Sequence, residues 1–97
     1  MGTARGILEQ KRDDILRLAA SRGAGRVRVF GSVARGEDGE DSDIDLLVEM
    51  DEGRSLLDLI GFALGVEGVT GRRVDVVTED GLHHLIRQQV LGEAQPL

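Results

Sequence analysis

Residues 27–48 read VRVFGSVARGEDGEDSDIDLLV, and this stretch decides the fold. It opens with a short β-like run over residues 27–30, which stops at Gly31. It closes with a second strand over residues 44–49, which is rich in branched side chains and leads into a polar turn at residues 51–53. A short helix or turn and an acidic loop lie between them. The stretch therefore predicts two strands joined by a compact connection.

The flanking sequence adds helices and a third strand. An apolar stripe over residues 3–22 predicts a helix, which Gly23 and Gly25 end. Ser55 is a suitable N-cap for a second helix. Residues 73–77 predict a third strand, and a final amphipathic helix follows it and ends before Pro96. Each helix is expected to carry its apolar residues on one side. These residues are Ile7, Leu8, Ile15, Leu18 and Ala19 in the first helix, Leu56, Leu59, Ile60, Ala63 and Leu64 in the second, and Leu82, Leu85, Ile86 and Val90 in the last.

This order predicts an α/β (α+β) chain with the element order α-β-α-β-α-β-α. The strands should form a small mixed sheet of about three strands, flanked by helices. No linker or internal repeat divides the 97 residues, so residues 1–97 are expected to form a single domain. The final helix could dock a partner, although packing on its own sheet is the plainer expectation.

Composition excludes several classes of protein. The formal net charge of -6 argues against a general nucleic-acid binder, and two aromatic residues, Phe30 and Phe62, cannot build a row of base-stacking rings. The chain has no cysteine, no bilayer-length apolar run and no signal-peptide pattern, so a cytoplasmic protein is expected. Six of the nine residues from 37 to 45 are acidic, and such crowding is costly unless the acids are solvated or face a cation.

Two of these acids, Asp43 and Asp45, lie at the start of the second strand. Strand alternation sends both carboxylates to one face, with their Cα atoms roughly 6.6 Å apart. Oxygen ligands of this kind suit Mg²⁺ together with substrate phosphates. The plainer alternative is that both acids are solvated at a strand end.

Asp75 lies among valines in the third strand. A carboxylate there needs either a partner or a position on the solvent-exposed face of an edge strand. If this strand lies beside the second, Asp75 can join Asp43 and Asp45, and three carboxylates could hold two divalent ions about 3.5 to 4 Å apart. Gly31-Ser32 directly follows a strand, where free backbone amides and the Ser32 hydroxyl suit phosphate oxygens. An ordinary turn is the alternative there.

A calcium-binding loop is a competing interpretation. Counting from Asp41, acids occupy positions one, three and five, and Glu52 occupies position twelve of an EF-hand loop. Leu46 stands where the loop needs a glycine, and the branched residues around it favour a strand. The interpretation is therefore rejected.

Gly31-Ser32-Val33-Ala34-Arg35-Gly36, followed by Ser42-Asp43-Ile44-Asp45-Leu46-Leu47-Val48, resembles the signature of the DNA polymerase beta-type nucleotidyltransferases. More narrowly, the chain is similar to the minimal nucleotidyltransferases, the MNT group. The resemblance covers nearly the whole chain, because the expected element order and Asp75 match as well. The tail Gln95-Pro96-Leu97 departs from the more hydrophobic ending associated with this family.

The resemblance implies a role for each matching residue. Gly31 and Ser32 would bind the triphosphate of ATP, and Asp43 and Asp45 would hold two Mg²⁺ ions. Asp75 would hold the ion on the acceptor side and help deprotonate the attacking hydroxyl. Arg35 is grouped with the nucleotide-binding residues, although pairing with the acidic loop that follows is the favoured role.

Four other features have structural interpretations. Gly36 should end the helical turn, and Ser42 should cap or brace the strand entry. His83 and His84 are expected to be surface residues that point in different directions. Arg72 and Arg73 could contact a partner or balance charge.

Relatives of this size pair with a helical HEPN protein as the antitoxin of a toxin–antitoxin system. The resemblance thus implies an enzyme that transfers AMP to a hydroxyl of a partner protein. The alternative is a non-catalytic antitoxin that neutralises a HEPN toxin by contact alone. A nucleic-acid acceptor is disfavoured by the acidic charge.

Overall fold

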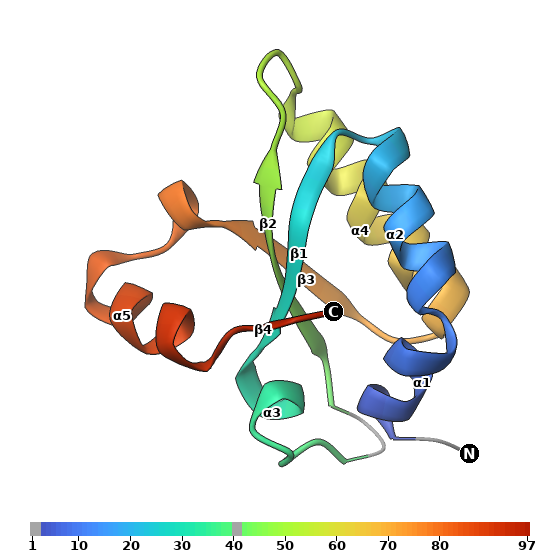
Figure 1. Ribbon diagram of the computed structural model, residues 1–97, viewed down its shortest axis with the longest axis vertical. Coiled ribbons are helices and arrows are strands. Elements are labelled where there is room, and N and C mark those ends of the chain that lie inside the picture. Colours follow the sequence, from blue (N-terminus) through green and yellow to red (C-terminus); the bar gives the residue numbers. More distant parts are fainter. Residues whose placement is uncertain (1–2, 40–41) are drawn as a thin grey trace.

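The computed structural model describes residues 3–39 and 42–97 (Figure 1). Helices and strands alternate along most of the chain, as the sequence predicts. The elements are α1 (Ala4–Gln10), α2 (Arg12–Ser21), β1 (Ala24–Phe30), α3 (Gly31–Ala34), β2 (Ile44–Met50), α4 (Leu56–Thr70), β3 (Val74–Thr78), a 3-10 turn η1 (Glu79–Gly81), α5 (His84–Glu93) and β4 (Gln95–Pro96).

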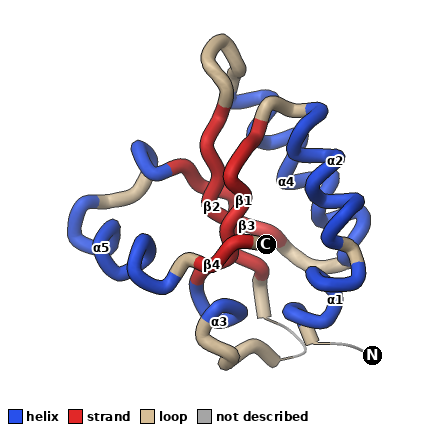
Figure 2. Tube along the Cα trace, viewed as in Figure 1, coloured by secondary structure: helices blue, strands red, loops and turns tan. Residues whose placement is uncertain are grey.

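The strands form one mixed sheet in the order β3-β2-β1-β4 (Figure 2). β1 pairs antiparallel with β2 and β4, and β2 pairs parallel with β3 through the crossover helix α4. The predicted mixed α+β architecture is confirmed. The fourth strand was not expected: it is two residues long and lies at the sheet edge, where Pro96 needs no N–H donor.

The hydrophobic core lies between one face of the sheet and the helices α1, α2 and α4, which Figure 1 shows together beside the strands. Strand alternation directs Val29 of β1 and Ile44, Leu46 and Val48 of β2 into this core. Phe62 of α4 is fully buried against them. The core thus fixes the register of β2, and with it the positions of the acids at its start.

The first predicted helix is divided into α1 and α2 at Lys11, whose φ of -101° and ψ of 10° depart from helical values. Both halves bury the predicted stripe, since Leu8, Ile15 and Ala19 belong to the core. The division lets the short α1 turn away from α2 toward α3, beside the end of β1 (Figure 1).

The predicted apolar face of α4 is wrong in part: Leu59 packs against the core, but most of the leucine and isoleucine side chains on that face do not. The sequence favoured the side that carries Leu56, Ile60 and Leu64, but these are 68%, 45% and 61% exposed. The helix instead buries Phe62, with Val66 and Thr70 one and two turns further on. α4 is apolar nearly all round, so its pattern could not identify which side meets the sheet.

The expectation that α5 packs on its own sheet is also largely wrong. Val90 is its one buried residue, whereas Leu85 is 77% and Ile86 47% exposed. Figure 1 shows α5 apart from the other long helices, on the opposite side of the sheet. In the described part of the chain, no helix has the length and apolar character that a bilayer crossing requires.

Candidate active site

Asp43 and Asp45 lie where the sequence placed them, at the entry to β2. Asp45 is half-buried within the strand, and Asp43 is exposed just before it. Ile44 between them is fully buried in the core, so the two carboxylates belong to the opposite face of the sheet. The predicted separation of acidic and apolar residues onto two faces is therefore confirmed.

Asp75 lies directly beside Asp45. The parallel register of β2 and β3 pairs Asp45 with Asp75, and adjacent strands are about 4.8 Å apart. β3 is an edge strand and Asp75 is exposed, so the wet edge-strand face that was its alternative explanation is also present. Asp75 is therefore both exposed to solvent and adjacent to Asp45.

The electrostatics of Asp45 reflect this crowding. The pKa of its carboxyl is raised to about 6, first by burial and then by the charges of Asp75 and Asp43. Arg35 lowers it, and Glu93 raises it. Negative charge therefore exceeds positive charge around Asp45, which makes the face favourable for a cation.

A divalent metal fits the chemistry of this face, although the side chains are not gathered into a ligand set. Within residues 3–39 and 42–97, no three His, Cys, Asp or Glu side chains are placed to hold a metal ion together. The donors at hand are carboxylate oxygens only, which suits Mg²⁺ and excludes a thiolate or imidazole site. Asp43 and Asp75 are both exposed and free to turn toward such an ion.

The raised pKa of Asp45 predicts a specific pH dependence of stability. Between its ordinary value of 3.8 and about 6, Asp45 binds more protons in the folded than in the unfolded chain. The free energy of unfolding should therefore fall as pH rises through this window and should level off above it. Because the carboxylate is half-buried and partly screened, we expect wild type to lose about 1 kcal/mol relative to D45N.

Urea unfolding of wild type and D45N at several values from pH 4 to pH 7 measures this difference. D13N is the matched control, since the Asp13 side chain on α2 is 87% exposed. It should follow the wild-type curve. A difference between wild type and D45N that does not change with pH would contradict the assigned environment of Asp45.

Gly31 connects these acids to the turn after β1. Its φ is 72°, in the left-handed region that favours glycine. A Cβ atom there would overlap the Asp45 carboxylate, because the residue before Gly31, Phe30, is paired with Asp45 across the sheet. Gly31, at the start of the turn, therefore lies directly against Asp45.

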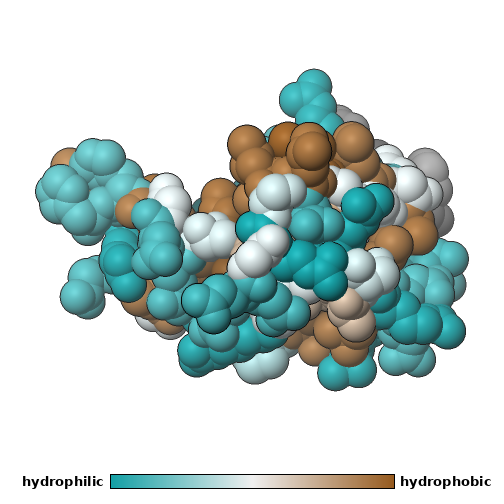
Figure 3. Space-filling view, turned by 90° about the horizontal axis from the view of Figure 1, so that it is seen from above, coloured by the Kyte–Doolittle hydropathy of each residue, from teal (hydrophilic) through white to brown (hydrophobic). Residues whose placement is uncertain are grey.

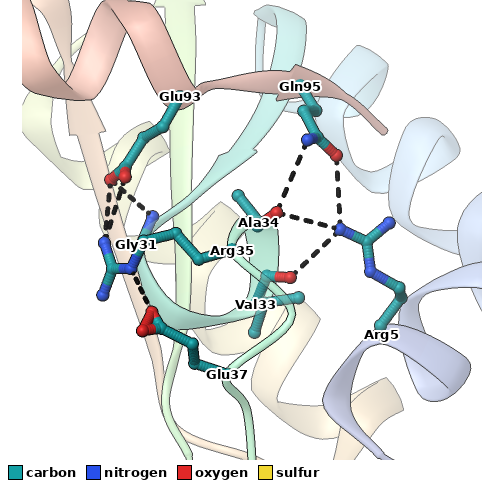
Figure 4. Close-up of polar contacts among 8 residues, drawn as sticks. All are labelled: Arg5, Gly31, Val33, Ala34, Arg35, Glu37, Glu93 and Gln95. Atoms are coloured by element: carbon teal, nitrogen blue, oxygen red, sulfur yellow. Dashed lines mark hydrogen bonds and ion pairs between the residues drawn. The ribbon is translucent and has the colours of Figure 1, made fainter.

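Arg35, at the end of α3, pairs with two acids. Its Nε donates to Glu37 at 2.6 Å, and its Nη1 donates to the Glu93 carboxylate at 3.0 and 3.3 Å (Figure 4). These hydrogen bonds, to Glu37 first, raise the pKa of Arg35. The alternative role of pairing with the acidic loop is confirmed. A role in binding nucleotide stays a prediction.

Glu93 could not be identified from the sequence. Its carboxylate accepts a hydrogen bond from the backbone N–H of Gly31 at 3.1 Å, although 62 residues separate the two. No local spacing relates an acid at the end of the last helix to a turn in the first third of the chain.

Two further residues hold the other end of α3. Arg5 donates to the carbonyl oxygens of Val33 and Ala34 at 3.1 and 3.3 Å, and the Gln95 amide donates to Ala34 at 3.4 Å. Arg5 also donates to Gln95 at 3.2 Å, as Figure 4 shows. Side chains from both ends of the chain therefore satisfy the free carbonyl groups of this short helix.

Arg28 is a second residue that the sequence did not single out. It lies on β1 and its side chain is only 8% exposed, with its guanidinium 3.0 Å from Glu79 of η1. Its Nε has no hydrogen-bond partner among the described residues. Alternation along β1 could have placed Arg28 on the face of Asp45, because it is two residues from Phe30.

The remaining predicted residues have structural roles. Gly36 follows α3 with a φ of 73°, and the Ser42 hydroxyl accepts a hydrogen bond from the N–H of Gly39 at 2.7 Å. Arg72 donates to the Gly39 carbonyl at 3.3 Å and so braces the acidic loop, while Arg73 is exposed.

His83 and His84 are exposed, as expected, but they do not diverge. Their rings stack with centroids 4.6 Å apart, because His83 is the N-cap of α5 and lies outside its helical geometry. The rejected calcium loop needed a sharp turn at Leu46, which lies instead inside β2. Glu40 and Asp41, which the sequence assigned to a solvated loop, lie outside the described residues.

Comparison with known proteins identifies the family of the chain. The model of the nucleotidyltransferase domain family matches residues 8–97. A relative from Methanocaldococcus jannaschii, named putative protein adenylyltransferase MJ0435, is 45% identical over 82% of this chain and 86% of its own. Protein adenylyltransferase MntA of Thermococcus cleftensis is 44% identical over 73% of this chain and 72% of its own.

Solved structures share the fold. A structure described as a putative minimal nucleotidyltransferase has a TM-score of 0.85 and 56% identity, and covers 96% of this chain and 95% of its own. A toxin–antitoxin crystal structure with AMP-PNP has a TM-score of 0.73 at 21% identity, over 87% of this chain and 69% of that one, and supports the fold alone. From the family match and these relatives, the chain belongs to the nucleotidyltransferase domain family and is a nucleotidyltransferase.

Proposed function

We propose that residues 1–97 form one nucleotidyltransferase domain that transfers AMP from ATP to a hydroxyl group of a partner protein. The observation that carries the proposal is the register of Asp45 with Asp75, beside Gly31 and on the open face of the sheet. Two relatives at 44% and 45% identity that are named protein adenylyltransferases, one of them provisionally, support a nucleotide donor and a protein acceptor.

We assign two Mg²⁺ ions to Asp43, Asp45 and Asp75. When bound, such ions neutralise charge that develops on the transferred phosphoryl group. The exposed Asp75 is open to an acceptor from solvent, whereas the half-buried Asp45 lies between Asp75 and the Gly31-Ser32 turn. From this order we assign the acceptor to the Asp75 side and the triphosphate to the side of Gly31 and Ser32.

The residues then have defined tasks. Gly31 and Ser32 orient the triphosphate, and Asp75 takes the proton of the acceptor hydroxyl. The hydroxyl oxygen forms a bond to the α-phosphorus while the bond from that phosphorus to the β-bridging oxygen breaks, and pyrophosphate leaves in line. Catalysis rests on positioning and electrostatics, with no covalent intermediate on the protein.

Label transfer tests the proposal. The full chain is incubated with Mg²⁺, a candidate acceptor protein and ATP labelled on the α-phosphate or, in parallel, on the γ-phosphate. We expect the α-label to become attached to the acceptor and the γ-label to be released as pyrophosphate. Attachment of the γ-label would show a kinase reaction, and attachment of neither would reject the enzyme proposal for that acceptor.

A second candidate function is contact alone, in which the chain covers a HEPN toxin without modifying it. Exposed apolar side chains in the first nine residues of α4 favour a partner: Leu56 is 68%, Leu57 75% and Leu64 61% exposed. Viewed from above, Figure 3 shows hydrophobic residues gathered in a patch against a largely hydrophilic surface. Such a patch is typical of an interaction surface.

Separate variants distinguish the two functions. We expect a variant with Leu57→Asp and Leu64→Asp to bind MgATP as wild type does, because α4 covers the face of the sheet opposite the aspartates. Its neutralisation of the toxin should fall if contact matters. Full neutralisation by a D43N, D45N chain would show that contact is sufficient, and loss of neutralisation in that chain alone would show that transfer is required.

A further inference from the structure

The carboxylate of Glu93 accepts hydrogen bonds from the donors at the Gly31 turn. One oxygen accepts from the backbone N–H of Gly31 at 3.1 Å, and both oxygens accept from Nη1 of Arg35 at 3.3 and 3.0 Å (Figure 4). The side chain is only 17% exposed. A carboxylate held by a backbone amide and a guanidinium shows that this position accepts an oxyanion.

The negative charge of Glu93 is unfavourable in these surroundings. Asp45 lies against Gly31, and the charge of Glu93 contributes to the raised pKa of Asp45. With Asp43 and Asp75, four carboxylates therefore share this region, and Glu93 adds repulsion to a face already rich in negative charge. The hydrogen bonds to Gly31 and Arg35 offset that repulsion as long as no other anion competes for them.

We propose that Glu93 occupies, in the nucleotide-free protein, the position that a phosphate group of the nucleotide takes at Gly31 and Arg35, so that Glu93 must leave when nucleotide binds. The inference rests on the proposed function, which assigns the triphosphate to the Gly31-Ser32 turn. It makes Glu93 a residue that sets nucleotide affinity by competition.

The surrounding contacts allow this exchange without loss of the turn. Arg5 and Gln95 hold the far end of α3 through the carbonyl oxygens of Val33 and Ala34, and these bonds do not involve Glu93. Arg35 keeps its bond to Glu37 at 2.6 Å when Glu93 departs. Glu93 lies at the end of α5, a helix with one buried residue, so its movement disrupts little packing.

Calorimetric titration of the full chain with MgATP tests the competition. We expect E93Q, which keeps the shape and removes the charge, to bind MgATP about fivefold more tightly than wild type, since a neutral amide oxygen accepts from Gly31 and Arg35 more weakly than a carboxylate does. E37Q is the matched control: it removes the other acidic partner of Arg35 but leaves the bond to Gly31 in place. Its affinity should stay within about twofold of wild type, because Glu37 is exposed.

A measurement on wild type makes the test independent of any variant. On saturation with MgATP, the carboxyl ¹³C signal of Glu93 should shift, and amide hydrogen exchange over residues 84–93 should become faster. Unchanged signals, or equal affinities of wild type and E93Q, would overturn the competition while leaving the proposed function intact. If neither wild type nor E93Q binds MgATP, the proposed function itself fails, and the competition fails with it.

Discussion

Replacing Asp43 and Asp45 by asparagine is expected to reduce AMP transfer at least about a thousandfold. Asparagine keeps the size of each side chain but removes the two charges that a metal-bound triphosphate requires. The fold should persist, because Asp43 is exposed and the charge on Asp45 is unfavourable in the folded chain above pH 6. The free energy of unfolding of the double variant should therefore equal or exceed that of wild type at pH 7.

Rates of label transfer and urea unfolding curves, measured on the same preparations, check both parts of this expectation. D13N serves as the matched control, since Asp13 is an exposed acid on α2, which covers the face of the sheet opposite the site. Transfer by the double variant within tenfold of wild type would remove these two aspartates from the catalytic machinery. Collapse of the fold would show that their role is structural.

Replacing Gly31 by alanine is expected to lower the free energy of unfolding by about 2 kcal/mol or more and to abolish binding of MgATP. Two effects combine: alanine is strained at a φ of 72°, and its Cβ overlaps the Asp45 carboxylate. To relieve the overlap, either the turn or the strand has to shift. The alignment of the turn with the aspartates is then lost.

Gly36 provides the control for this variant. Its φ of 73° matches that of Gly31, but a Cβ there would meet no atom within 4 Å. G36A should therefore cost only the backbone strain, about 1 kcal/mol, and should retain nucleotide binding. The excess cost of G31A over G36A should shrink in a D45A background, as a double-mutant cycle would show. Equal costs of the two single variants would mean that Asp45 does not constrain Gly31.

The sequence could predict the parts of the site that depend on local pattern. Branched residues identify β2, and alternation around the buried Ile44 separates Asp43 and Asp45 from the core. The nearness of Asp75 needed one further assumption, that β3 lies beside β2, and the parallel pairing confirms it. The roles of these residues in catalysis stay predictions that the variants above test.

Other parts could not be predicted, for physical reasons. α4 is apolar on nearly every side, so helical periodicity could not show that Phe62, not Ile60, faces the sheet. α5 has an amphipathic pattern, yet the sheet offers it little surface beyond Val90. The bond between Glu93 and Gly31 arises from tertiary arrangement alone, since no rule of local spacing relates residues so far apart.

The hydrogen bonds that join Arg5, Gln95 and Glu93 to the residues of α3 also have a consequence for the order of events during synthesis. All three aspartates and Gly31 leave the ribosome before Glu93 and Gln95 do. The turn after β1 is therefore made early but is held in place late, by bonds that span 62 residues to Glu93 and 90 residues between Arg5 and Gln95. Contacts of such long range form slowly, because closing a long loop costs entropy. A growing chain thus carries Asp43, Asp45 and Asp75 before it carries Glu93 and Gln95, which bond to Gly31 and to the far end of α3.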